Sequence, residues 1–166
     1  GNELWVTDGT VAGTRMLKNF NSTTQNSGNI YWSGTFYKAG NRAVFAVNDL
    51  ENGYQLWASD GTELGTVRLT NTSQTDTNYF DSFAAIGSKL IFRARSSNER
   101  NLWITDGTTA GTFELMNVND GDDAWNELVT NGSAFAFRTN NTSVGSELFY
   151  SDGTVAGTRI LDLNEG

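Results

Sequence analysis

The chain has 166 residues, a formal net charge of -8, and no cysteine, histidine or proline. Without Cys and His, disulfides, thiolate nucleophiles, imidazole bases and zinc sites of the usual ligand set are excluded. The negative charge disfavours nucleic acid and anionic membrane surfaces as partners, because each phosphate contact needs a Lys or an Arg, and no apolar run approaches the roughly 20 residues of a membrane span.

An eleven-residue motif occurs four times along the chain. It reads Leu, Trp or Phe, any residue, Ser or Thr, Asp-Gly-Thr, two variable residues and Gly-Thr. The aspartates of the four copies lie 52, 46 and 46 residues apart and are Asp8, Asp60, Asp106 and Asp152. A repeat of this length is typical of propeller blades or helical arrays. Because the segments are rich in Thr, Trp, Tyr, Phe and Val, which favour strands over helices, the sequence predicts blades.

The predicted strands follow the repeat in chain order. Residues 1–20 supply only a third and a fourth strand, which is the outer half of a blade. Residues 21–70 form a blade with strands over 30–37, 43–48, 54–59 and 66–70, after an inserted loop at 21–29. Residues 71–117 form a blade with strands over 80–86, 89–95, 101–105 and 112–117, a Gly87-Ser88 hairpin and a connection at 96–100. Residues 118–166 form a blade with strands over 125–130, 134–139, 147–151 and 158–162.

The sequence therefore predicts an all-β fold, a β-propeller segment of four-stranded antiparallel blades with about three complete blades plus one outer half-blade. Propellers close with roughly 4 to 8 blades. We therefore expect these residues to be a portion of a longer chain. Its missing strands would lie upstream of Gly1, and its neighbouring blades would be partners of this segment.

The Asp-Gly-Thr segment predicts a turn between the third and fourth strands. Its Asp can accept hydrogen bonds from backbone N–H groups one to three residues on, and the following Gly permits a positive φ. The two Thr hydroxyls can satisfy loop backbone groups, and the second Gly, such as Gly13, lets the chain return into the outer strand. Leu and Trp point to opposite faces of their strand, so both can be buried between blades. We interpret the motif as a folding device rather than a binding site.

These residues resemble a known family. The Leu-Trp-x-Ser/Thr-Asp-Gly-Thr-x-x-Gly-Thr repeats are similar to those of the ELWxxDGT repeat proteins, sometimes labelled hyalin-like, which are bacterial surface or secreted chains. The four copies span the whole chain, with Phe149 in place of Trp and with Gln55 and Asn101 in place of Glu. The resemblance implies a β-propeller and an extracellular or cell-surface location, and it implies no catalytic residue. The loop position is also similar to the Asp-box of sialidases, although the spacing differs.

Three groups of residues are candidates for further chemistry. Arg93 and Arg95 share one face of a strand, which is compatible with a sialidase-like arginine cluster and also with packing between blades. The acidic run 119–123 offers oxygen ligands for calcium, but it occurs once, and a solvated turn is favoured. Sequons for N-glycosylation occur in expected loops or turns at Asn21, Asn71, Asn131, Asn140 and Asn141.

Two functions are compatible with this sequence. The favoured one is a non-catalytic extracellular β-propeller repeat module for adhesion, ligand binding or assembly of a surface structure, with an unidentified protein or glycan as partner. This reading assigns no catalytic, cofactor-binding or metal-binding residue. The alternative is a sialidase-like propeller glycoside hydrolase fragment, which needs polar groups at the ring centre. First-strand residues would supply these groups, such as Tyr79, Asp81, Asn126 and Glu127.

Overall fold

The structure is a computed structural model that describes residues 3–20, 35–49, 53–71, 80–96, 99–117, 128–141 and 145–161. These residues form fourteen β-strands and no helix. None of the described residues lies in a helix long and apolar enough to cross a membrane.

The strands form four antiparallel sheets in which each strand pairs with its neighbour in sequence. The first sheet has β1 (Leu4–Val6) and β2 (Arg15–Lys18). The second has β3 (Tyr37–Ala39), β4 (Arg42–Asp49), β5 (Gly53–Ser59) and β6 (Val67–Arg68). The third has β7 (Phe80–Ile86), β8 (Lys89–Ser96), β9 (Glu99–Thr105) and β10 (Phe113–Asn117). The fourth has β11 (Leu128–Thr130), β12 (Phe135–Asn141), β13 (Gly145–Ser151) and β14 (Arg159–Leu161).

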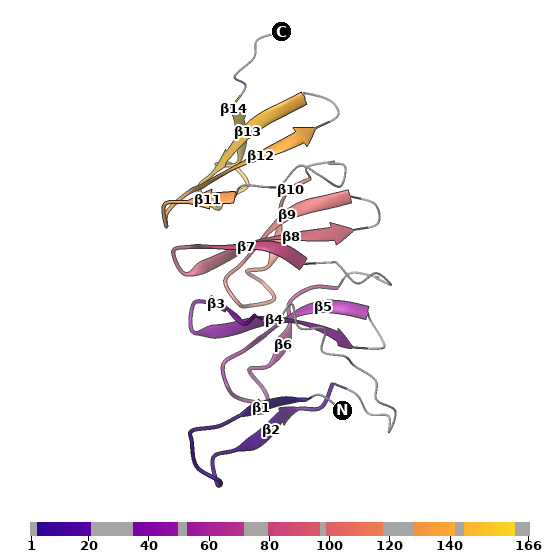
Figure 1. Ribbon diagram of the computed structural model, residues 1–166, viewed down its shortest axis with the longest axis vertical. Helices are drawn as coiled ribbons and strands as arrows, with labels where there is room; N and C mark the ends of the chain where they lie inside the picture. Colours follow the sequence, from indigo (N-terminus) through magenta and orange to yellow (C-terminus); the bar gives the residue numbers. More distant parts are fainter. Residues whose placement is uncertain are drawn as a thin grey trace.

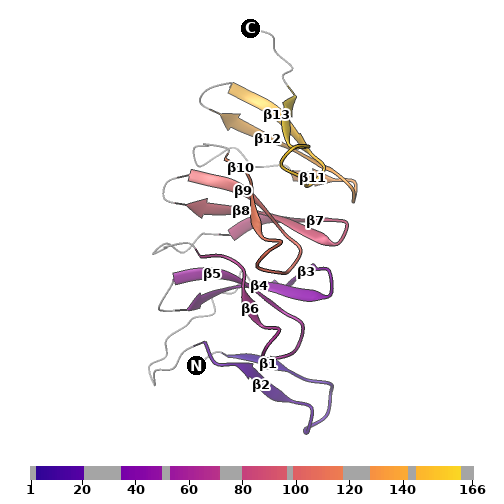
Figure 2. The same cartoon turned by 180° about the vertical axis from the view of Figure 1, so that it is seen from behind.

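The four sheets stack one on another in chain order, with the first and fourth sheets at the two ends (Figure 1). Seen from behind, the loops between third and fourth strands lie on the same side of the stack as the turns between first and second strands (Figure 2). The predicted all-β class and the four-stranded antiparallel sheets are confirmed. Closure of the stack into a propeller stays a prediction.

Several predicted strand boundaries are wrong in the described residues, and two of them have a clear physical reason. The strand expected over 30–37 begins at Tyr37 and runs to Ala39, because the two-residue turn at Gly40 and Asn41 sets its register with β4. The connection expected at 96–100 is shorter, because Ser96 pairs with Glu99 in the β8–β9 ladder. Three predicted segments lie outside the described residues, namely residues 30–34 of the strand expected over 30–37, residues 125–127 of the strand expected over 125–130, and the inserted loop at 21–29.

The hydrophobic core is divided into three seams, one between each pair of successive sheets. The repeated Leu packs on the next sheet, where Leu56 and Leu102 are fully buried. The repeated Trp or Phe packs on the preceding sheet, where Trp57 and Phe149 are buried. The prediction that the two side chains face opposite ways is therefore confirmed, since successive residues of a strand alternate between the faces of a sheet.

Main-chain hydrogen bonds also join the second, third and fourth sheets at the turns between their first and second strands. The Gly40 N–H donates to the Ser88 carbonyl of the third sheet at 2.6 Å, and the Gly87 N–H donates to the Gly132 carbonyl of the fourth sheet at 2.6 Å. Gly40 and Gly87 have φ of 57° and 55°, a conformation that a side chain would resist. These turns therefore fix the spacing of neighbouring sheets as well as the register of each hairpin.

Candidate functional site

The Asp-Gly-Thr loop has the same internal hydrogen bonds in all four sheets. In the third sheet, Asp106 Oδ1 accepts the Thr108 N–H at 2.8 Å and the Thr108 hydroxyl at 2.6 Å. The Thr108 Oγ1 accepts the Gly111 N–H at 3.0 Å, and the Thr108 carbonyl accepts the Thr112 hydroxyl at 2.6 Å. The Asp Oδ1 to Thr N distance is 2.9 Å in each of the other three loops. The predicted Asp turn and the predicted use of both Thr hydroxyls are confirmed.

The base of the loop is closed by two more hydroxyl contacts. The Thr105 Oγ1 lies 2.6 Å from the Thr112 Oγ1, which joins the end of β9 to the start of β10. The Thr105 Oγ1 also accepts the Gly107 N–H at 2.9 Å. Gly107 has a φ of 87°, as the motif predicts for its first Gly. Ser or Thr at the position before the Asp is therefore required by the loop itself.

The second Gly of the motif is required for a reason that the sequence did not reveal. A Cβ added to Gly111 would lie 2.1 Å from the Asp106 Oδ1, and the corresponding distances at Gly13, Gly65 and Gly157 are 2.0, 1.9 and 2.1 Å. No real Cβ approaches an oxygen so closely. Besides the expected return of the chain into the outer strand, which stays a prediction, this Gly therefore leaves room for the carboxylate.

The four loop carboxylates are stabilised in their ionised form. The pKa of Asp8, Asp60, Asp106 and Asp152 is lowered, first because the hydroxyl of the Thr two residues on donates to the carboxylate, and further because the N–H of that Thr donates to it. Arg42 adds to the effect at Asp60, and its guanidinium lies 3.5 Å from the carboxylate. The carboxylates are thus occupied by their own loops.

The loops of the second, third and fourth sheets each reach toward the sheet before it. The Thr109 hydroxyl donates to the Arg68 carbonyl of the second sheet at 3.1 Å. Similarly, Arg15 of the first sheet donates to the Gly61 carbonyl in the loop of the second sheet at 3.2 Å. A Cβ on Gly153 would lie 3.2 Å from the Ile104 side chain of the third sheet. The loops therefore belong to the seams between sheets, which supports the interpretation of the motif as a folding device.

The residue before the motif Leu has a structural role that the sequence interpretation missed. Glu3 accepts the Phe20 N–H at 3.0 Å, Gln55 accepts the Thr70 hydroxyl at 3.0 Å, and Asn101 donates to the Glu114 carboxylate at 3.0 Å. Glu, Gln and Asn differ in charge but all bind at or just beyond the fourth strand. Gln55 and Asn101 thus keep a contact with the outer strand where the first copy has Glu3, and the common signal was a polar side chain at one motif position.

Arg93, which was a candidate for a sialidase-like arginine cluster, forms an ion pair in the third sheet. Asp81 and Arg93 are cross-strand partners on β7 and β8, and the Arg93 Nη2 donates to the Asp81 Oδ2 at 2.7 Å while its Nε donates to the Oδ1. Two parallel bonds of this kind fix the guanidinium plane. Arg93 is thus held against the sheet. Arg95 lies on β8, but its side chain is outside the described residues, as are Tyr79, Asn126 and Glu127.

The remaining candidates are placed only in part. The acidic run 119–123 and Asn21 lie outside the described residues, and in the residues described no three Asp, Glu, His or Cys side chains are grouped to hold a metal ion. Asn71 and Asn131 are exposed, and Asn131 caps its own turn by accepting the Ala134 N–H at 2.8 Å. Asn140 and Asn141 were expected in a loop, but they lie in β12, because pairing with Ser146 and Gly145 extends that strand.

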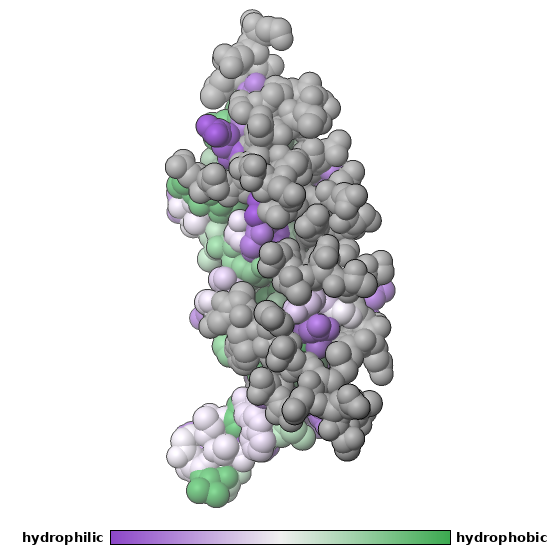
Figure 3. Space-filling model, turned by 45° about the vertical axis from the view of Figure 1, so that its right-hand side comes forward, coloured by the Kyte–Doolittle hydropathy of each residue, from purple (hydrophilic) through white to green (hydrophobic). Residues whose placement is uncertain are grey.

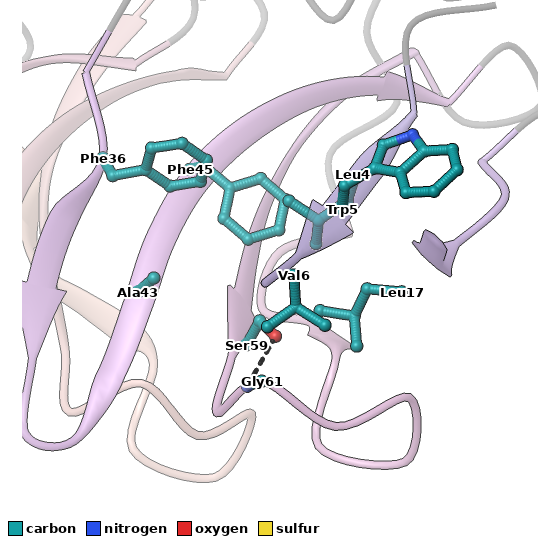
Figure 4. A pocket seen from close by; sticks show the side chains of 9 residues that line it. All are labelled: Leu4, Trp5, Val6, Leu17, Phe36, Ala43, Phe45, Ser59 and Gly61. Atoms are coloured by element: carbon teal, nitrogen blue, oxygen red, sulfur yellow. Dashed lines mark hydrogen bonds between the residues drawn. The ribbon is translucent and has the colours of Figure 1, made fainter. Parts of the chain in front are cut away.

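An apolar pocket lies between the first and second sheets. Its volume is about 270 Å³, and it is lined by Leu4, Trp5, Val6, Leu17, Phe36, Ala43, Phe45, Ser59 and Gly61. In Figure 4 the side chains of Phe36 and Phe45 lie on one side of β1, and the Trp5 indole lies on the other. Trp5 is 60 % exposed, although it has the motif position of the buried Trp57. The face of the first sheet that carries Trp5 is therefore exposed, whereas the equivalent faces of the second and fourth sheets, which carry Trp57 and Phe149, are buried against a neighbouring sheet.

Apolar side chains are also exposed elsewhere on the molecule. Val11 is almost fully exposed in the loop of the first sheet. Figure 3 shows a small hydrophobic patch at the lowest point of the molecule, the end at which Figure 1 places the first sheet. At the other end of the stack, Val129 is exposed and Leu148 is half-buried. Both ends of the stack thus present apolar surface to solvent.

Comparisons of the chain with protein-family models, with curated proteins and with solved structures gave no match. The function is therefore inferred from the contacts of the chain itself, above all from those between its successive sheets.

Proposed function

We propose that the chain is a non-catalytic, extracellular β-propeller repeat module that acts by assembly with further sheets of the same kind. The observation that carries this proposal is the repeated seam, in which the Leu face of one sheet packs on the Trp or Phe face of the next. The extracellular location is proposed from the motif resemblance alone, and a protein or glycan partner is compatible with the same role.

The inner seams show what each face contacts. In the seam between the third and fourth sheets, Leu102 and Ile104 pack against Phe137 and Phe149. Leu148 is the equivalent of Leu102, and on the fourth sheet its face has no sheet beyond it among the described residues. Trp5 is the equivalent of Phe149, and its face is likewise uncovered by any described sheet. The two end faces therefore carry the complementary halves of one seam.

A contact between unlike faces is heterologous. Such contacts generate a ring when the rotation between units closes and an open filament when it does not. The Leu face of the fourth sheet would receive the Trp face of the first sheet of the next unit. The predicted propeller would instead close within a longer chain, whose neighbouring blades would cover these two faces. Burial of the exposed Trp5 and Met16 would provide the hydrophobic stabilisation.

The hydrolase alternative gains no support from the described residues. It requires convergent polar groups around a central pocket, and the described arginine candidate, Arg93, is bound to Asp81 on the adjacent strand. The described pocket is lined mainly by apolar side chains from the first and second sheets.

Sedimentation velocity at increasing protein concentration tests the proposal. The unmodified chain should self-associate, and Trp5→Lys and Leu148→Lys should each weaken association by placing a charge on one end face. Leu64→Lys is the matched control, because Leu64 is exposed at a loop tip that belongs to neither face. A mixture of the two end variants should form dimers only, since one compatible pair of faces remains. A chain that stays monomeric at every concentration, or end variants that behave like Leu64→Lys, would contradict the proposal.

A further inference from the structure

Each of the four repeated loops contains an Asp-Gly pair, a dipeptide that isomerises readily in an unstructured chain. In this reaction the Gly amide nitrogen attacks the Cγ of the Asp carboxyl group, and the amide proton and the carboxyl hydroxyl leave as water. Water then opens the resulting cyclic imide at either of its two carbonyls, which gives Asp or isoaspartate. Gly favours the attack because it has no Cβ to hinder it. The pairs begin at Asp8, Asp60, Asp106 and Asp152.

The attacking nitrogen is held by a hydrogen bond in every loop. The Gly107 N–H donates to the Thr105 hydroxyl at 2.9 Å, and the equivalent distances in the first, second and fourth sheets are 3.0, 3.1 and 3.0 Å. The amide proton must leave before the nitrogen can attack, so an acceptor that retains this proton opposes the reaction. Gly107 and Thr105 are also buried, so hydroxide reaches the proton poorly.

The carboxyl group is held by other partners. Asp106 Oδ1 accepts the N–H and the hydroxyl of Thr108 at 2.8 and 2.6 Å, which directs the carboxylate toward the residue after the Gly. Gly111 lies against the same group, since a Cβ there would be 2.1 Å from the Oδ1. The Thr108 hydroxyl lowers the pKa of Asp106, so the carboxyl stays ionised. An ionised carboxylate loses an oxygen far less readily than the neutral acid, so both orientation and charge oppose the attack.

The same contacts recur at an Asn-Gly pair outside the motif, in the turn between β11 and β12. The Gly132 N–H donates to the Thr130 hydroxyl at 3.0 Å. Asn131 Oδ1 accepts the N–H and the hydroxyl of Ser133 at 3.0 and 3.1 Å. An Asn-Gly pair forms the same cyclic imide with loss of ammonia in place of water. Two different kinds of turn in this chain therefore share one arrangement around a reactive pair.

We propose that these four Asp-Gly pairs and the Asn-Gly pair are modification sites that the folded chain holds inactive, and that the Ser or Thr hydroxyl before each pair protects it. Loss of this hydroxyl releases the pair to form isoaspartate. The recurrence of a hydroxyl at this position supports the assignment, since it is supplied by Thr7, Ser59, Thr105, Thr130 and Ser151. This inference does not depend on the assembly of sheets proposed above, because every contact that carries it lies within one turn.

The test follows isoaspartate at Asp106 during long incubation at neutral pH. Its proteolytic peptides are separated by chromatography, because the Asp and isoaspartate forms have equal mass. The folded chain should react about tenfold or more slowly than the guanidinium-unfolded chain, since more than one hydrogen bond opposes the attack. Thr105→Val should raise the rate in the folded chain by about threefold to tenfold, the effect of losing one hydrogen bond. Thr105→Ser should stay slow, because Ser59 and Ser151 make the same contact.

Thr112→Val is the matched control. It removes the same 2.6 Å contact between Thr105 and Thr112, but it leaves the hydroxyl that holds Gly107, so its rate should stay close to that of the unmodified chain. The loops of the other sheets report global unfolding within each sample, and isoaspartate should rise at Asp106 alone. Equal rates in the folded and unfolded chains, equal rates in Thr105→Val and Thr112→Val, or acceleration of all loops together would overturn the proposal.

The Asn-Gly pair provides a second measurement. Deamidation of Asn131 adds a negative charge, so ion-exchange chromatography of the intact chain separates the product. Thr130→Val should accelerate this change by a similar factor, because it removes the acceptor of the Gly132 N–H. Val129→Ala is the control, since Val129 is exposed beside the turn. A Thr130→Val chain that deamidates no faster than the Val129→Ala chain would contradict the protective role of the hydroxyl.

Discussion

Trp5 and Trp57 occupy the same position of the repeated motif, yet Trp5 is 60 % exposed and Trp57 is 9 % exposed. The Trp57 ring packs against the first sheet, where the Phe20 ring centroid lies 4.9 Å away and the Lys18 ammonium lies 5.2 Å from the indole. Trp5 has no preceding sheet among the described residues. Burial of the motif Trp is therefore determined by the neighbouring sheet and not by its own strand.

The first prediction compares these two tryptophans. Trp57→Ala should lower the free energy of unfolding by roughly 3 kcal/mol or more, since it removes a buried aromatic side chain from a seam. Trp5→Ala should change it by less than about 1 kcal/mol, because most of its side chain is already in water. Urea unfolding followed by circular dichroism, at a concentration where the chain is monomeric, measures both. Equal losses in the two variants would show that the Trp face does not form the seam.

The second prediction concerns the space that Gly111 leaves for the Asp106 carboxylate. Gly111→Ala should destabilise the chain by about 1 to 3 kcal/mol, the usual cost of overpacking, because its Cβ would collide with the carboxylate. In an Asp106→Ala background the collision is removed, and the same Gly111→Ala change should cost much less. A double-mutant cycle measured by chemical unfolding gives the coupling energy. Simple additivity of the two changes would show that close approach is not the reason for the Gly.

The third prediction separates a turn from a cation site. Asp106→Asn should be mild, because Asn keeps the acceptor oxygen for the Thr108 N–H and hydroxyl. Asp106→Ala should cost about 1 to 2 kcal/mol through unsatisfied donors. Chelator should leave the Tm of the unmodified chain unchanged. A Tm that falls by several degrees in chelator and recovers with calcium would instead indicate ion binding by the repeated loops.

The fourth prediction is a pH dependence with a defined sign. The pKa of the loop aspartates is lower in the folded chain than the unfolded value of about 3.9. A lowered pKa means that the ionised form stabilises the folded state, so this stabilisation is complete well above the unfolded pKa. It is lost as the pH falls through the lower, folded pKa. Asp106→Asn should make the acid limb of the stability curve less steep, as measured by urea unfolding across the acidic range. An unchanged acid limb would argue against this linkage.

The fifth prediction concerns the ion pair of the third sheet. Arg93→Ala should be clearly destabilising, because the Arg93 side chain is only 11 % exposed and the Asp81 carboxylate would lose a bidentate partner. The double variant Arg93→Ala with Asp81→Ala should lose less free energy of unfolding than the sum of the losses in the two single variants. Thermal or chemical unfolding of all four proteins gives the coupling. Strict additivity would show that the contact contributes nothing to folding.

The sequence by itself determined the local structure of this protein. The Asp-Gly-Thr loop could be predicted because its hydrogen bonds join residues at most seven positions apart, so the motif contains both donors and acceptors. The opposite directions of Leu56 and Trp57 could be predicted because alternation is a property of any strand. The all-β class followed from the repeat and its composition. Function and propeller closure stay predictions.

Only the tertiary structure decided which of these residues meet and which remain open. Asp81 faces Arg93 in a register that shifts between Asp81 and Ala84, where Ser82 has a φ of 54°, and no local pattern marks that shift. The close approach of Gly111 to a carboxylate, the exposure of Trp5 and the pocket beside Val6 were equally invisible in the sequence. Each depends on contacts across the folded chain or on the presence of a neighbouring strand, and four nearly identical motif copies cannot distinguish a filled seam from an open one.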